Sequence, residues 1–180
     1  MRKSPILAAL LLLSACASSP ESRYFTLSTT PPQRSPTQEK PQFHLATVKL
    51  PELYDRPNLV TRTSPQSVEI DEYDRWAEPL ERMTARILAQ DIALRRPRFA
   101  GPVVAGTDQP KLQVSIDEFA ADRGAGRAVL SGNWKIVETD GTTRGGAFSY
   151  SQPASGSDSA AIAAAMSALL GQLADEIDRN

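Results

Sequence analysis

The chain has 180 residues, with 20 basic and 21 acidic side chains, so its formal net charge at pH 7 is −1. Because there is no basic excess, this composition excludes a protein that holds nucleic acid mainly through charge. A single cysteine excludes an internal disulfide. The length suits one domain with a sizeable hydrophobic core.

The first sixteen residues have the layout of a secretory signal. Arg2 and Lys3 give a positive start, residues 6–13 are apolar, and small residues precede Cys16. The apolar run is too short for a membrane-spanning helix, which needs about 20 residues. We therefore expect residues 1–15 to be a signal peptide that is removed from the mature protein.

The four residues Leu13, Ser14, Ala15 and Cys16 resemble the lipobox of bacterial lipoproteins. That resemblance implies that Cys16 is lipidated and becomes the first residue of the mature chain. The alternative is an ordinary signal peptide with a chance cysteine. In such lipoproteins an aspartate after the cysteine often signals retention at the inner membrane, whereas Ala17 follows here. We therefore expect a lipid anchor at the periplasmic face of the outer membrane.

Residues 16–23 are small and polar, and they predict a short lipidated tether. The single folded domain is expected over residues 24–180. The chain from Cys16 to Tyr24 spans at most about 28 Å, so the domain lies close to its lipid. Four prolines within residues 29–42 predict an exposed loop, because proline cannot extend a helix or a strand ladder.

The first half of the domain is rich in short strand patterns. In the run FHLATVKL, alternation places Leu45 on one face of a strand and Val48 on the other. Pro65 separates two further runs that we expect to form a hairpin. The predicted strands are residues 24–27, 43–50, 59–63 and 67–73.

Residues 79–96 predict the first amphipathic helix. Pro79 suits the first helical turn, where its missing N–H costs nothing. Arg95 and Arg96 suit the negative end of the helix dipole. The expected apolar stripe contains Leu80, Met83, Ile87 and Leu94, with Leu88 beside it.

The second half of the domain predicts three antiparallel strands and a closing helix. Apolar residues at offsets of three and four predict that helix up to residue 180, and Ser157 or Asp158 can cap it. All elements together predict an α+β fold, a two-layer sandwich. It has a mainly antiparallel sheet of about six or seven strands with two amphipathic helices on one face. The three strands are residues 111–119, 128–138 and 145–152.

No catalytic residue, metal site or cofactor is predicted, and we expect the protein not to be an enzyme. A metal site needs clustered ligands, but the only histidine, His44, is expected at the surface or an edge of its strand. An acidic cluster allows two interpretations, acid–base chemistry or a solvated strand end that leads into the helix. The cluster consists of Glu69, Asp71, Glu72 and Asp74.

Two longer stretches are more specific: LPELYDRPNLVTR at residues 50–62 and DRWAEPLE at residues 74–81. Together with the lipobox and the run RYFTL, they resemble the ABC-type transport auxiliary lipoprotein family, the PqiC/YmbA-like group. The resemblance covers nearly all of the mature chain. It implies an α/β sandwich without enzymatic activity, which serves MCE-type systems that move phospholipids between the two membranes. The implied partners are an MCE-domain protein, its ABC or membrane subunits, and further copies in a ring.

The two stretches supply the candidate partner-interface residues, because Trp, Tyr and Arg dominate binding hot spots. For each of them a structural role is the alternative. The loop can simply build a turn between strands, the tryptophan can cover the start of the helix, and the neighbouring arginine can pair locally. The candidates are Leu53, Tyr54, Arg56, Arg75 and Trp76.

Three functions follow from the sequence. The first is an accessory subunit that docks the periplasmic transport component at the outer membrane. The second is a stand-alone lipid-binding lipoprotein, which needs an apolar cavity of about 300 to 1,000 Å³. The third and weakest is a hydrolase that uses the acidic cluster.

Overall fold

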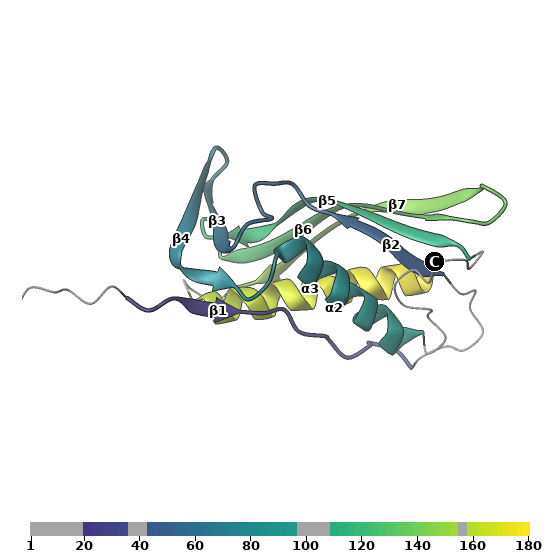
Figure 1. Cartoon of the computed structure of the whole chain (residues 1–180), viewed down its shortest axis with the longest axis horizontal. Helices are drawn as coiled ribbons and strands as arrows, with labels where there is room; N and C mark the ends of the chain where they lie inside the picture. Colours follow the sequence, from purple (N-terminus) through teal and green to yellow (C-terminus); the bar gives the residue numbers. More distant parts are fainter. Residues whose placement is uncertain (1–19, 36–42, 97–108, 155–157) are drawn as a thin grey trace, which may run out of the picture.

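A computed structural model describes residues 20–35, 43–96, 109–154 and 158–180. Within these ranges seven strands form one mixed, mostly antiparallel sheet, and two long helices lie on one side of it (Figure 1). This architecture confirms the α+β sandwich. The elements are β1 (Arg23–Phe25), β2 (His44–Lys49), β3 (Asn58–Ser64), β4 (Ser67–Trp76), α2 (Leu80–Arg95), β5 (Lys111–Asp122), β6 (Arg127–Val137), β7 (Thr143–Pro153) and α3 (Ser159–Arg179).

The long strand β5 organises the sheet, whose order is β1-β4-β3-β5-β6-β7. One edge of β5 pairs with β6 in antiparallel fashion from end to end. The other edge is shared, since β2 pairs in parallel with Lys111–Ser115 and β3 pairs in parallel with Ala121 and Asp122. The predicted hairpin of β3 and β4 and the predicted antiparallel series β5-β6-β7 are both confirmed.

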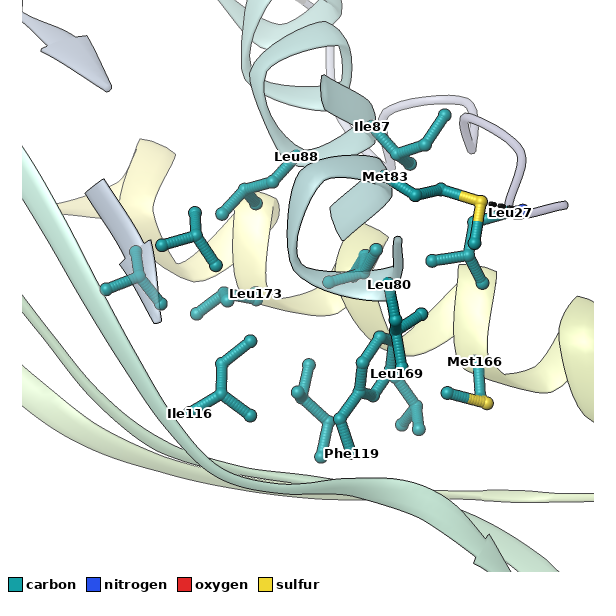
Figure 2. Packing of buried hydrophobic residues seen from close by; sticks show 14 of the residues in the cluster. Leu27, Leu80, Met83, Ile87, Leu88, Ile116, Phe119, Met166, Leu169 and Leu173 are labelled. Carbon is teal, nitrogen blue, oxygen red and sulfur yellow. Dashed lines mark hydrogen bonds between the residues drawn. The ribbon is translucent and has the colours of Figure 1, made fainter. Parts of the chain in front are cut away.

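The helices bury their apolar faces against the sheet and against each other. Helix α3 crosses β6 and β7, and α2 packs on α3 and along β2. Figure 2 shows Leu80, Met83, Leu169 and Phe119 meeting between the layers, all at most 2% exposed. Burial of each such side chain stabilises the folded protein by about 1.5 to 3 kcal/mol. The side chain of Asp158 caps α3 by accepting the N–H of Ala160, as predicted.

The prediction for the buried face of α2 was wrong at Leu94, which is 46% exposed. The buried face instead runs through Thr84, Leu88, Asp91 and Arg95. A purely apolar periodicity misses this face, because two of its members are charged residues that are paired inside the protein.

Three further predictions near the strand ends are corrected. A bulge between Leu45 and Thr47 shifts the alternation of β2, so Leu45 and Val48 are both buried. His44 is 1% exposed rather than at the surface. The strand predicted to end at residue 73 continues as β4 to Trp76.

The close contact between β5 and β6 leads to a prediction about Gly132. A Cβ atom at Gly132 of β6 would lie 2.2 Å from the carbonyl oxygen of Ser115, in the backbone of β5. We expect Gly132→Ala to lower the free energy of unfolding by about 2 kcal/mol or more, because backbone must move to admit the methyl group. The same change at Gly146 on β7 is the control, since its Cβ would meet nothing closer than 3.7 Å. Equal denaturant midpoints for both variants would contradict this reading of the β5–β6 contact.

Candidate functional site

The two specific stretches of the sequence bind each other at the start of α2. Helix α2 begins after Pro79, which provides no side-chain cap. Asp55 supplies that cap from the other stretch, because its Oδ1 accepts the N–H of Glu81 at 2.9 Å. In return Oε2 of Glu81 accepts the N–H of Leu50 at 3.1 Å. These residues of the two motifs therefore have a structural role, because they join the loop to the start of the helix.

Two of the five interface candidates lie inside this joint. Tyr54 and Trp76 are each 5% exposed. The hydroxyl of Tyr54 accepts a hydrogen bond from Arg62, and burial raises the pKa of this phenol. Trp76 is the last residue of β4, and its backbone N–H donates to the carbonyl of Pro57 at 2.7 Å. Both side chains therefore pack beneath the surface. This agrees with the alternative given above, in which they have a structural role and do not contact a partner.

The other three candidates lie at the surface. Leu53 is 39% exposed, while Arg56 and Arg75 are partly exposed. The Nε atoms of both arginines are shielded from solvent, and in the part of the chain that the structure describes they have no hydrogen-bond partner. On the sheet Arg75 stands between Asn58 of β3 and Tyr24 of β1.

The sequence analysis missed Tyr24, which is 66% exposed. Only its pairing with Arg75 in the parallel β1–β4 ladder brings it to this region. An aromatic residue in the first strand carried no signal by itself. We call Tyr24, Leu53, Arg56 and Arg75 the docking face.

The acidic cluster is dispersed in the structure. Asp74 is 1% exposed and accepts two hydrogen bonds of 2.6 Å from Arg23 and one from Ser159. Burial opposes its charge, but these donors hold the pKa of Asp74 below its ordinary value. Asp71 accepts backbone N–H groups of its own strand, and Glu69 pairs with Arg123. Three of the four carboxylates thus serve the fold, while Glu72 is exposed. No group of metal ligands occurs among the described residues.

A buried charge network joins the two helices to the segment after β1. Arg95 and Asp91 of α2 are 2% and 0% exposed. Asp91 accepts the backbone N–H of Thr30 at 2.8 Å. The five N–H groups of Arg95 reach the carboxylate of Asp175 and the backbone carbonyls of Thr30, Pro31, Asp91 and Gly171.

Two apolar hollows flank the helices. The larger, of about 570 Å³, lies between β2 and α2, with Leu45, Val48, Ala85 and Ala89 on its walls. The second, of about 490 Å³, lies between the segment around β1 and α3. Helix α3 is long and apolar enough to cross a membrane by length and composition alone, but most of its apolar window is buried inside this domain.

The comparisons with known proteins decide the family. The family model for the ABC-type transport auxiliary lipoprotein component matches residues 25–178. The chain belongs to this family. The match spans both motifs, the joint they form and three residues of the docking face, Leu53, Arg56 and Arg75, while Tyr24 lies just before it. Among curated proteins no sequence matches the chain.

Two solved structures share the fold of this auxiliary lipoprotein. One is a crystal structure of an uncharacterized protein, with a TM-score of 0.76, 19% identity, and coverage of 89% of this chain and 98% of that one. The other is protein XCC0632 from Xanthomonas campestris, of family DUF330. It has a TM-score of 0.67 and 23% identity, and the match covers 86% of this chain and 91% of that one.

The joint at α2 predicts a specific capping effect. Replacing Asp55 by alanine removes the acceptor for the N–H of Glu81, so the free energy of unfolding should fall by about 1 kcal/mol. Asp55→Asn keeps an acceptor oxygen and should restore most of that loss. Denaturant unfolding of the two variants measures the difference. If alanine and asparagine were equally destabilising, Asp55 would not act as the cap.

The network at Asp91 predicts a pH effect on stability. Burial raises the pKa of this carboxyl from an ordinary value near 3.8 to about 6. Between these values the folded protein binds a proton that the unfolded chain has released, so stability is lost as pH rises. The loss amounts to roughly 2 kcal/mol between pH 4 and pH 7.

The variant Asp91→Asn isolates this effect, because the amide oxygen can still accept the N–H of Thr30 but does not titrate. Unfolding free energies of both proteins are measured from pH 4 to pH 7. The wild type should lose stability relative to the variant across this range. A constant difference between the two proteins would show that Asp91 is already ionised at pH 4.

Proposed function

We propose that this auxiliary lipoprotein is a non-enzymatic docking subunit of an MCE-type intermembrane phospholipid transport system. It is anchored through Cys16 at the periplasmic face of the outer membrane, where it receives the periplasmic transport component. The observation that carries the proposal is the family match over residues 25–178. The signal peptide and Cys16 lie outside the described residues, so the anchor is part of the proposal.

The position of β1 supports a tethered role. Strand β1 pairs with β4 in the sheet, and Arg23 binds the buried Asp74. The folded body therefore begins at Arg23, and the chain back to Cys16 spans at most about 25 Å. An anchor at Cys16 would keep the domain within that distance of the membrane surface.

The docking face supports the choice of contact residues. The Nε atoms of its two arginines have no hydrogen-bond partner among the described residues, and arginine prefers the planar carboxylate or phosphate groups that it can bind bidentately. Tyr24 adds exposed aromatic area beside Arg75, and Leu53 is exposed in the same loop as Arg56. We therefore assign partner contact to Arg56 and Arg75, with Tyr54 and Trp76 positioning the backbone beneath them.

Crosslinking in the native envelope tests the proposal. The full-length protein is crosslinked mildly, purified and analysed by mass spectrometry, and an MCE-domain protein should be recovered. Reversing both charges with Arg56→Glu and Arg75→Glu should lower that recovery about tenfold or more, which corresponds to a loss of about 1.4 kcal/mol.

Lys135→Glu is the charge-reversal control, because Lys135 is exposed toward the other end of β6, where its partner Gln113 on β5 pairs with β2 and not with β3. Recovery should be unchanged in this variant. If no MCE-domain protein is recovered from the wild type, the transport assignment fails. If it is recovered equally with the double variant, the partner binds elsewhere on the domain.

A further inference from the structure

The larger apolar hollow has the form of an open groove. Helix α2 runs alongside β2, with Leu80 and Glu81 near Leu50 at one end and Arg96 over the ring of Phe43 at the other. Between these ends the helix presents alanine at positions 85, 89 and 93 toward β2. Because alanine is small, the space between helix and strand stays unfilled, and its volume is about 570 Å³.

One end of the groove is positively charged. Arg82 and Arg86 lie on its wall, and both are bound to the single carboxylate of Glu78. Two guanidinium groups that share one carboxylate leave a net positive charge at this rim. None of the described lining residues is acidic. An apolar trough with a cationic end is complementary to a ligand with an apolar tail and an anionic head.

The dimensions suit one acyl chain. Along α2 the lined stretch from Arg82 to Ala93 is about 16 Å long at 1.5 Å per residue. One leaflet of a bilayer is about 15 Å thick, half of the hydrocarbon core of roughly 30 Å. The volume also falls within the usual range for a small-molecule site, about 300 to 1,000 Å³.

A peptide strand fits this groove less well. The edge of β2 that faces α2 would have to offer a regular ladder to an added strand. The pairing of β2 with β5 shifts register between Leu45 and Thr47, so the backbone of β2 is irregular where it lines the groove. Bulges of this kind protect sheet edges from pairing. An acyl chain needs no backbone partners and is indifferent to the bulge.

We propose that the groove between α2 and β2 binds one acyl chain of a phospholipid, with Arg82 and Arg86 holding its phosphate. This site is separate from the docking face and does not depend on a protein partner. It gives the domain a lipid-binding activity of its own, in addition to docking.

Photocrosslinking in the intact envelope tests the proposal. Cells that make the full-length protein are fed a fatty acid carrying a diazirine, so that their phospholipids become photoreactive. After irradiation the protein is purified and digested, and adducts are identified by mass. We expect adducts with the mass of a whole phospholipid on the peptides that contain β2 and α2.

Two variants test the site in different ways. Ala89→Trp should fill the groove and lower the adduct yield about tenfold or more. The control Ala147→Trp, at an exposed position of β7, should leave the yield unchanged. Arg82→Gln with Arg86→Gln leaves the groove open but removes the charge, and it should lower the yield of phospholipid adducts severalfold. Thermal unfolding confirms that each variant is folded.

Three results would overturn the proposal. The first is the absence of phospholipid adducts from these peptides in the wild type. The second is an unchanged yield in a folded Ala89→Trp protein. The third is an adduct in the groove that carries only the protein's own N-terminal acyl group or a peptide of another protein, since the occupant would then be the anchor or a protein partner.

Discussion

The side chain of Arg95 is the constraint on which the helical layer depends. It is buried, yet each of its five N–H groups has an acceptor, on α2 itself, on α3 or on the segment after β1. A buried guanidinium without these acceptors would be strongly unfavourable, and breaking such a network costs about 3 to 5 kcal/mol. The relative position of the two helices is therefore fixed by charge as well as by apolar packing. This in turn holds the segment after β1 against them.

Hydrogen bonds inside the domain also explain why the two sequence motifs contain so many polar residues. Asp55 caps α2, Glu81 binds the loop in return, and Asp74 joins β1 to α3 through Arg23 and Ser159. These hydrogen bonds connect the loop before β3, the strands β1 and β4, and both helices. In Arg56 and Arg75 the Nε atoms have no hydrogen-bond partner among the described residues, and this is why we assign recognition to these two arginines.

The architecture was predictable from the sequence because most of its elements obey a simple period. Helix α3 and strand β6 bury the residues that their periods of 3.6 and 2 indicate. In β5 the alternation holds only as far as Ile116, where a bulge follows and residues 119–121 are all buried. The hydrophobic pattern gave wrong predictions where an interaction between distant segments decided which residues are buried. Arg95 and Asp91 displaced Leu94 from the core, and the bulge in β2 depends on its pairing with β5.

The candidate site was predictable only in part. The sequence identified both motifs but could not separate Trp76, which faces the core, from Arg75, which faces outward, because that depends on where β4 ends. Nor could it place Tyr24 next to Arg75, since the two residues are brought together by a parallel pairing between distant segments. The groove between α2 and β2 likewise arises from the packing of two elements and not from any local motif.

The central claim is that this rigid domain works at a membrane on a short lipid tether. Its most direct test is the intact mass of the mature protein, measured separately from outer- and inner-membrane fractions. The account predicts a chain that begins at Cys16, carries the mass of attached acyl chains and is found in the outer membrane. A chain without acyl groups that is released as a free protein would contradict the account.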